Sequence, residues 1–160
     1  MSRRAVQPEK EPSRPTMKNQ YTISTDALPS ISELLGLFAQ AGWARKRNHG
    51  DIDRLLQNTD VFVVVRHGGS LVGFGRALSD GVFRALVDDI IVDQAHRSQG
   101  IGQIIVRTLM KQLSAVEEVF LNTGHHLESF YSKCGFKEFD GLTMVAEQDA
   151  AADAVHRAVR

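Results

Sequence analysis

The stretch IIVDQAHRSQGIGQIIVRTLM, residues 90–110, decides how the chain folds. It begins inside an apolar run that is typical of a strand (81–93) and ends inside an amphipathic helix (102–115), whose apolar side chains share one face. A second short apolar run, 117–123, follows this helix. Strand, helix and strand in this order form a crossover, which we expect to be right-handed and to place the two strands parallel.

The loop between the first strand and the helix holds Arg97, Gly100 and Gly102 in the pattern R-x-x-G-x-G. The backbone N–H groups in the first turn of a helix have no partner within the helix and carry partial positive charge. Glycine lets a ligand phosphate approach these groups without meeting a Cβ atom. The loop is therefore a candidate anion-binding site that suits a pyrophosphate. A tight turn with no ligand is the alternative.

Two other kinds of phosphate-binding loop fit the sequence poorly. A nucleoside-triphosphate loop ends in G-K-[ST], whereas this loop continues as Gly102-Gln103-Ile104. A dinucleotide fingerprint needs a third glycine near position 105, where Ile105 stands, and it follows the first strand of its unit, whereas several strands precede this one. The sequence therefore disfavours both nucleotide classes.

The patterns elsewhere in the chain predict a mixed α/β sheet whose strands are antiparallel up to residue 93. Ser30 is the expected N-cap of the first helix, and Gly135 is the expected left-handed cap at the end of the last helix. The other expected elements are a strand at 21–25, helices at 30–42, 51–58 and 126–135, a hairpin of strands at 60–78 around HGGS, and a closing strand at 142–147.

Length and charge limit the class of protein. A chain of 160 residues fits one ordinary domain, and we divide it into a disordered tail (1–16), a single domain (17–147) and a C-terminal tail or short helix (148–160). Lys and Arg together number 19, as do Asp and Glu, so the formal net charge is zero. That balance argues against nucleic acid or an anionic membrane as the main partner.

A single cysteine, Cys134, argues against a disulfide framework and a CxxC metal site, and we expect no metal. No apolar run approaches the length of a membrane span. The first residues also lack the apolar segment of a secretory signal. We therefore expect a cytoplasmic protein with no membrane partner.

A second motif, ESFYSKCGF (128–136), holds Phe130, Tyr131, Gly135 and Phe136 in the pattern F-Y-x-x-x-G-F. Core packing of the aromatic rings is the plain explanation of this motif. Together with the glycine loop, however, and joined to it by a helix and a strand of suitable length, the motif resembles the GCN5-related N-acetyltransferases (GNAT).

The resemblance covers residues 20–146, with the motifs concentrated in 86–136. It implies an α/β fold with a central, mostly antiparallel, twisted sheet that is flanked by helices. One parallel pair of strands in this sheet would splay apart around an acetyl-CoA site. The resemblance also implies the transfer of an acetyl group from acetyl-CoA to a primary amine by direct attack.

The stretch 71–102 further resembles the small cyanobacterial and plastid-type members, some of which acetylate arylalkylamines such as serotonin and some of which acetylate protein lysines. We therefore expect a small arylalkylamine, such as serotonin or tryptamine, as the acceptor. Three alternatives stay open: a protein lysine acetyltransferase acting on a peptide, an N-terminal acetyltransferase, and a non-catalytic acyl-CoA-binding regulatory module. The sequence also leaves a homodimer open.

The resemblance assigns a set of residues to the co-substrate acetyl-CoA. The strand residues Ile90, Ile91 and Val92 would offer backbone groups to its pantetheine arm, and the glycine loop would hold its pyrophosphate. The expected acetyl-CoA-binding residues are Ile90, Ile91, Val92, Arg97, Ser98, Gln99, Gly100, Ile101, Gly102, Gln103, Asn122, Ser129 and Tyr131.

Acetyl transfer needs a base, because an alkylamine is mostly protonated at neutral pH, and the departing thiolate benefits from a proton donor. The resemblance gives the donor's role to Tyr131, whose phenol suits it. Asp89 is our first candidate for the base and Asp88 the second, because consecutive strand residues face opposite sides and one of the two should face the acceptor. An ordinary ion pair with an arginine is the alternative for either aspartate.

His125 and His126 follow the strand at 117–123 and are further candidates for moving a proton, since histidine titrates near neutral pH. Solvated surface histidines are the alternative for both. Plant-type members often carry an acidic residue seven positions before the tyrosine, and this chain has Gly124 there.

The resemblance places the acceptor pocket at the early helices, residues 30–58. Phe38 and Trp43 are the aromatic residues there that would suit an indole amine, and Asp51 and Asp53 are the acidic residues that would attract a cation. A core position for Trp43 is the alternative.

Overall fold

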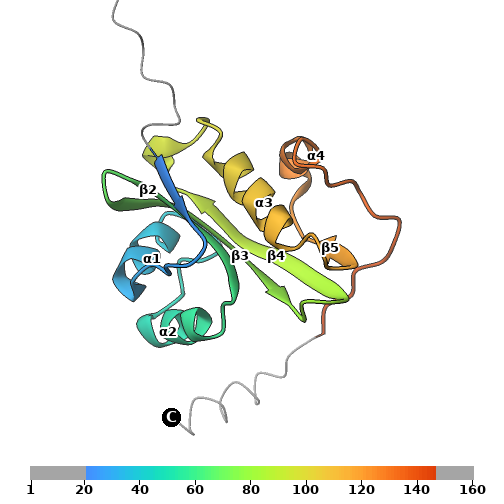
Figure 1. Ribbon diagram of the computed structural model, residues 1–160, viewed down its shortest axis with the longest axis horizontal. Helices are drawn as coiled ribbons and strands as arrows, with labels where there is room; N and C mark the ends of the chain where they lie inside the picture. The colour runs from blue at the N-terminus through green and yellow to red at the C-terminus, as the bar shows by residue number, and fades with distance from the viewer. Residues whose placement is uncertain (1–20, 147–160) are drawn as a thin grey trace, which may run out of the picture.

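The computed structural model describes residues 21–146, so the tails expected at 1–16 and 148–160 lie outside the described residues. A five-stranded sheet in the order β1-β2-β3-β4-β5 forms the centre of this part, with helices on both faces (Figure 1). The elements are β1 (Tyr21–Ser24), α1 (Ile31–Phe38), α2 (His49–Gln57), β2 (Val61–His67), β3 (Ser70–Ser79), β4 (Arg84–Val92), a 3-10 turn η2 (Gln94–His96), α3 (Ile101–Gln112), β5 (Glu118–Phe120), a 3-10 turn η3 (His125–Leu127) and α4 (Glu128–Ser132).

The strand pairing confirms the predicted topology. Strands β1 to β4 pair antiparallel in sequence order, and β4 pairs parallel with β5 across helix α3. Gly68 and Gly69 join β2 to β3, and both have positive φ (55° and 85°), as a two-residue hairpin turn requires. The predicted meander and the predicted crossover are therefore both present.

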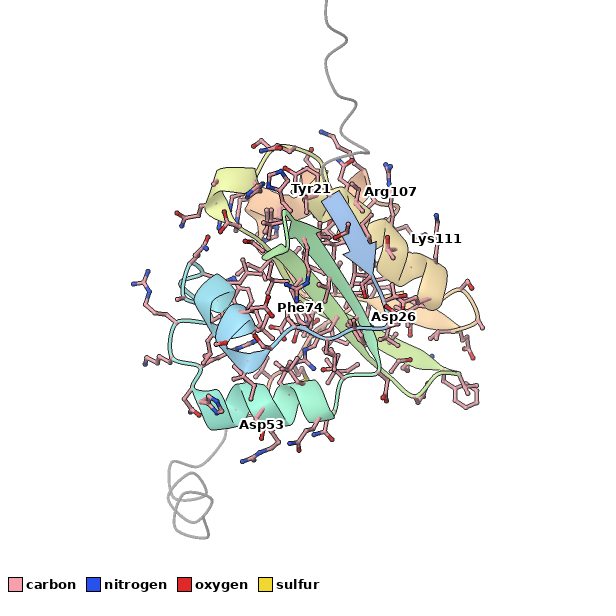
Figure 2. The ribbon with its side chains drawn as sticks, turned by 60° about the vertical axis from the view of Figure 1, so that its left-hand side comes forward. Tyr21, Asp26, Asp53, Phe74, Arg107 and Lys111 are labelled. Atoms are coloured by element: carbon pink, nitrogen blue, oxygen red, sulfur yellow. The ribbon has the colours of Figure 1, made fainter. Side chains whose placement is uncertain are left out.

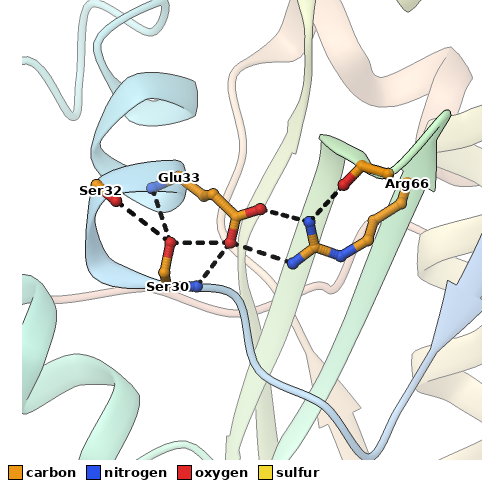
Figure 3. A network of polar contacts seen from close by, with 5 residues as sticks. Ser30, Ser32, Glu33 and Arg66 are labelled. Carbon is orange, nitrogen blue, oxygen red and sulfur yellow. Dashed lines mark hydrogen bonds and ion pairs between the residues drawn. The ribbon is translucent and has the colours of Figure 1, made fainter.

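Helix α1 begins at a capping box. Ser30 accepts a hydrogen bond from the Glu33 backbone N–H, and the Glu33 carboxylate accepts one from the Ser30 backbone N–H. The same carboxylate pairs with the Arg66 guanidinium of β2, which fixes α1 against the sheet (Figure 3). Hydrogen bonds from Arg66, and then from the Ser30 backbone, lower the pKa of Glu33 to about 2. Ser30 is the cap that the sequence predicts.

Two apolar clusters cover the two faces of the sheet. Helices α1 and α2 pack on one face around the fully buried Phe74, and α3 packs on the other face, where Arg107 and Lys111 lie on its outer side (Figure 2). The first cluster contains Leu34, Leu37, Phe38, Ala41, Ala44, Ile52, Phe62, Val64, Phe74 and Ile91. The second contains Val63, Val65, Val72, Ala77, Ala85, Val87, Ile101, Ile105, Leu109 and Leu113.

Strand β4 carries a bulge that the sequence analysis did not predict. Phe74 pairs with Ile91 and Arg76 pairs with Asp88, so β4 holds one more residue than β3 between these pairs. Asp89 lies within this bulge, and its backbone adopts the left-handed conformation, with φ 54°. Asp88 and Asp89 both reach Arg76. The expectation that consecutive residues here face opposite sides is therefore wrong, because the bulge interrupts the alternation.

The parallel pair is short and opens along its length. Pairing between β4 and β5 covers only Arg84 to Leu86 against Glu118 to Phe120. Strand β4 then runs on to Val92 without β5 beside it. The two strands thus separate toward α4 (Figure 1), as the resemblance to the GNAT fold implies.

The closing strand expected at 142–147 is wrong for the residues described. Residues 142–146 form no strand, and the side chains of Leu142, Met144 and Val145 are 83–88% exposed. Strand β5 is only three residues long, so its free edge offers few backbone groups to pair with.

The last helix is also shorter than predicted: α4 and η3 together replace the helix expected at 126–135. Gly135 nevertheless ends it with φ 96°, as predicted for a left-handed cap. The helix expected at 51–58 begins earlier than predicted, because Asn48 caps α2. Across residues 21–146, the structure contains no helix with the length and apolar character needed to cross a membrane.

Candidate active site

A cavity of about 470 Å³ opens between the end of β4, the glycine loop, the start of α3 and helix α4. Both sequence motifs therefore border the same space. The predicted acetyl-CoA residues that line it are Ile90, Val92, Arg97, Ser98, Gly100, Ile101, Gly102, Gln103 and Tyr131. His96, Leu127 and Phe130 line it as well.

The start of α3 has the features of an anion-binding site. Gly100 is its N-cap, at φ 83°, and no side chain caps the helix, whereas Ser30 and Asn48 cap α1 and α2. The first backbone N–H of α3 to find a partner within the helix is that of Ile104, which donates to the Gly100 carbonyl (3.1 Å). The N–H groups of the residues before it are left for a ligand. This arrangement fits a pyrophosphate.

Arg97 adds a positive charge to the same wall. Its Nε donates to the Val92 carbonyl (3.2 Å), so the guanidinium is held at the end of β4. The terminal amino groups remain for a phosphate, which a guanidinium can bind in a bidentate manner.

The loop that carries Arg97 is hydrogen-bonded to the turn that directly follows helix α1. Gln40 donates from Nε2 to Asp93 Oδ2 (2.7 Å), and its Oε1 accepts from the Gln94 backbone N–H (2.9 Å). Asp93 in turn caps η2 through the Ala95 N–H. The hydrogen bond from Gln40 is the main cause that lowers the pKa of Asp93. The loop therefore has a fixed shape before any ligand enters.

Tyr131 lies in α4, in an aromatic cluster at the far wall of the cavity. Its ring meets Phe130 edge-on at 4.9 Å between ring centroids and Phe136 at 6.1 Å. Burial raises the pKa of the Tyr131 phenol, with smaller contributions from Cys134 and from the charge of Asp88. The phenol is therefore fully protonated at neutral pH and is available as a proton donor.

Gly102 allows α3 and α4 to approach closely. A Cβ atom at this position would lie 3.1 Å from the Phe130 ring, which is tighter than ordinary packing allows. The second glycine of the loop thus serves the contact between the two walls of the cavity, in addition to any approach of a ligand.

The two aspartates of β4 have different surroundings. Asp89 is fully buried, with Arg76 Nε 2.6 Å from its Oδ2 and Arg47 Nη2 2.7 Å from its Oδ1. The contact with Arg47 is an ion pair without hydrogen-bond alignment, since Asp89 Oδ1 has no aligned donor. Asp88 is 47% exposed and lies 3.7 Å from Arg76 Nη2. Asp89 is thus bound to two cations, and Asp88 is open to solvent.

The remaining predicted site residues lie outside the cavity. Ile91 is buried in the first apolar cluster, on the opposite face of the sheet. Ser129 and His126 are exposed and line neither this cavity nor a larger neighbouring hollow of about 960 Å³. Asn122 and His125 line that second hollow, which shares Tyr131 with the first.

Gln99 also does not line the cavity, and its amide is hydrogen-bonded to Tyr21 (2.7 Å) and Ala95 (3.4 Å). Sequence reasoning gave no role to His96, which lines the cavity, or to Arg47 and Arg76, which hold Asp89. The position of His96 directly before Arg97 in the sequence could have indicated that it lines the cavity.

The early helices supply fewer residues for binding the acceptor amine than expected. Phe38 is buried in the core, whereas Trp43 is 59% exposed, so the core alternative for Trp43 is wrong. The Arg47 guanidinium lies over both rings, 4.5 Å from the Phe38 centroid and 5.1 Å from that of Trp43. Asp53 lies on α2, across the sheet from α3 (Figure 2).

Asp51 lies in the first turn of α2, where its backbone N–H and its carboxylate both bond to Asn48. Within residues 21–146, no group of three or more His, Cys, Asp or Glu side chains is placed to hold a metal ion.

Comparison with known proteins identifies the family. A profile of the acetyltransferase (GNAT) family matches residues 28–136. The chain therefore belongs to the GNAT acetyltransferase family, whose members generally use acetyl-CoA.

Relatives and solved structures agree with this assignment. The chain is 31% identical over 118 residues to GCN5-related N-acetyltransferase 1, chloroplastic, of Arabidopsis thaliana, a match that covers 71% of this chain and 59% of that protein. It is 28% identical over 112 residues to serotonin N-acetyltransferase 2, chloroplastic, of Oryza sativa subsp. japonica, covering 66% and 56%. Both names say chloroplastic, so the expected cytoplasmic location stays a prediction.

A solved GNAT-family acetyltransferase from Streptococcus pneumoniae TIGR4 superimposes with a TM-score of 0.71 at 24% identity. The superposition covers 81% of this chain and 98% of the other. At this identity the match establishes the fold, which is the mixed sheet that the sequence predicts.

Gly100→Ala tests the anion-binding site. The new Cβ would meet no protein atom within 4 Å, but it would stand where a phosphate approaches the start of α3. We predict that acetyl-CoA binds about tenfold more weakly or worse, measured as Kd by isothermal titration calorimetry.

Gly81→Ala is the matched control, because Gly81 also has positive φ (78°) and open space around it but lies in the β3–β4 turn. Both variants should lose a similar stability, about 1–2 kcal/mol. Equal affinities for acetyl-CoA in the two variants would contradict the assignment.

Proposed function

We propose that this protein is an acetyl-CoA-dependent N-acetyltransferase that acts on a primary amine, with a small arylalkylamine as the first choice of acceptor. One observation carries the proposal: a single cavity joins the uncapped start of α3 and Arg97 to the phenol of Tyr131. The first two groups suit a pyrophosphate, and the third is a proton donor at the opposite wall.

Acetyl-CoA supplies an activated acetyl thioester. In the proposed reaction the amine nitrogen forms a bond to the acetyl carbon, the carbon–sulfur bond breaks, and its electron pair leaves on sulfur. The amine loses one proton to a base, and the sulfur gains one from Tyr131, so the amide and free CoA are the products. No covalent bond to the protein is needed.

Asp88 is the base that the geometry favours. Its carboxylate is half-exposed, and its charge is the smallest of the three causes that raise the pKa of Tyr131. Asp89 has the opposite character, because two arginines hold its buried carboxylate. A base must be free to receive a proton, which favours Asp88 over our first candidate. Asp89 instead fixes the bulge and the two arginines.

Two observations support an aromatic amine as the acceptor. Trp43 is exposed and stacks with Arg47, which in turn is bound to Asp89, so an aromatic surface is linked to the strand that carries Asp88. A relative from rice is named as a serotonin N-acetyltransferase. An exposed indole is complementary to the ring of an arylalkylamine, and a carboxylate is complementary to its ammonium group.

The acceptor class is tested by measuring CoA release with serotonin, tryptamine, glucosamine 6-phosphate and a lysine peptide at matched concentrations. We predict that kcat/KM is highest for serotonin or tryptamine. A higher value for the lysine peptide would replace the acceptor class by protein lysines and leave acetyl transfer in place. Binding of acetyl-CoA with no turnover on any acceptor would favour a non-catalytic acyl-CoA-binding module.

Tyr131→Phe tests the proton donor. We predict that kcat falls by about 100-fold or more while the Kd of acetyl-CoA stays nearly the same, because the ring and its packing are kept. Since burial raises the pKa of Tyr131, the protonated form persists through neutral pH. In the unaltered protein, loss of the phenol proton should therefore lower kcat only on the alkaline side, above the range in which an ordinary phenol titrates. An unchanged kcat in the variant would assign the phenol a structural role.

Asp88→Asn and Asp89→Asn separate the two aspartates. We predict that Asp88→Asn keeps the melting temperature and lowers kcat by about 100-fold, because it removes the base. Asp89→Asn should lower the free energy of unfolding by about 3 kcal/mol, because two arginines lose their buried counter-charge. Thermal unfolding and turnover are measured on both variants. Full activity in Asp88→Asn would move the base to another group.

A further inference from the structure

Three aromatic side chains from distant parts of the chain meet beside the cavity. Tyr21 of β1 pairs in register with His67 of β2, and their ring centroids lie 5.1 Å apart. His96, at the end of η2, lies 5.0 Å from the His67 ring and 5.7 Å from the Tyr21 ring. Of these three residues, His96 alone lines the cavity. The catalytic chemistry proposed above uses none of them.

A chain of hydrogen bonds fixes which nitrogen of His96 carries a proton. Gln99 donates from Nε2 to the Ala95 carbonyl (3.4 Å), so its Oε1 is the atom that faces Tyr21. The Tyr21 hydroxyl donates its only proton to that oxygen (2.7 Å). The 3.0 Å contact between Tyr21 Oη and His96 Nδ1 must then be donated by His96.

This assignment limits what His96 can offer to a ligand. With the proton on Nδ1, the neutral ring has a bare lone pair on Nε2, which repels a phosphate oxygen. After the ring takes up a second proton, Nε2 becomes a charged donor, and a hydrogen bond to phosphate from a charged group is strong. Nε2 is the one polar ring atom that the network leaves to the cavity.

Charged and titratable groups from several elements surround His96. Asp93 and Arg97 flank it on its own segment, and Asp93 and His96 attract each other. Its ring lies against His67 of β2 and the phenol of Tyr21 of β1. Tyr131 of α4 lines the same cavity as His96. A phosphate in the cavity would add two or more negative charges and favour the protonated ring.

We propose that His96 is a phosphate-binding residue of this site that binds acetyl-CoA in its doubly protonated form, with Tyr21 and Gln99 as positioning residues. The proposal rests on the proposed function, since it concerns the same cavity. Binding of acetyl-CoA then takes up a proton at neutral pH. Affinity must consequently rise as the pH falls through the range in which imidazoles titrate, about pH 8 to 5.

The ligand itself can also titrate, and this effect has the opposite sign. A phosphate monoester has a second pKa near 6, so the 3′-phosphate of CoA gains a proton and loses charge as the pH falls. Dephospho-CoA lacks that group, and its pyrophosphate keeps the same charge in this range. A comparison of acetyl-CoA with acetyl-dephospho-CoA therefore separates the protein's proton from the ligand's.

The experiment is isothermal titration calorimetry with both ligands at pH 6, 7 and 8, each in two buffers that differ in ionisation enthalpy. For acetyl-dephospho-CoA we expect Kd to rise about tenfold or more from pH 6 to 8, with a fraction of a proton taken up at pH 7. His96→Gln keeps a polar side chain without the titration, and we expect its Kd to vary less than twofold over this range. Thermal unfolding confirms that the variant is folded.

Two further variants make the result specific. His67→Gln removes the neighbouring imidazole, which does not line the cavity, and should keep the pH dependence. Tyr21→Phe keeps the ring contacts but removes the acceptor for His96 Nδ1, so affinity at pH 6 should fall severalfold and the proton uptake at pH 7 should change. A merely structural tyrosine would not alter proton uptake.

The outcomes separate this proposal from the proposed function. A pH profile of His96→Gln equal to that of the unaltered protein, or a profile abolished by His67→Gln instead, would overturn the role of His96 while acetyl transfer stands. Failure of the unaltered protein to bind acetyl-CoA at any pH would overturn both.

Discussion

The rest of the site depends on one constraint in the middle of β4, where Asp89 adopts a left-handed backbone conformation within a strand. Such a conformation costs about 1–3 kcal/mol and persists only where its surroundings hold it. Arg47 and Arg76 provide that hold through the buried carboxylate. The bulge gives Ile90 and Val92 to the cavity, turns Ile91 to the opposite core, and brings Asp88 and Asp89 to one arginine.

Features that depend on neighbours in the sequence could be predicted from it. The uncapped start of α3 follows from the glycines of the loop, and the two positive φ values of the β2–β3 turn follow from Gly68-Gly69. The position of Tyr131 beside the loop followed from two motifs in the right order. In each case a few adjacent residues specify the local geometry, and the crossover rule supplies the rest.

Features that depend on distant contacts could not be predicted. The sequence VDDIIV does not alternate between apolar and polar residues, so it does not show which residue forms the bulge. Asp88 and Asp89 were therefore ranked on the assumption of a regular strand, which is absent here. The arginines that bind Asp89 come from β3 and from the segment before α2. Residues 142–146 show the opposite failure, because their apolar residues predict a strand, whereas Leu142, Met144 and Val145 are exposed in the described part of the chain.

The hydrogen bonds that join the glycine loop and η2 to Tyr21 and Gln40 have a consequence for folding. These hydrogen bonds join residues 75, 78 and 53 positions apart, so loop-closure entropy must be overcome before they form. The loop cannot reach its binding shape while the N-terminal strand and first helix are undocked. A ligand bound at the loop therefore stabilises the contacts of β1 and α1 as well. The protection of their backbone amides against hydrogen exchange should then increase with the ligand concentration.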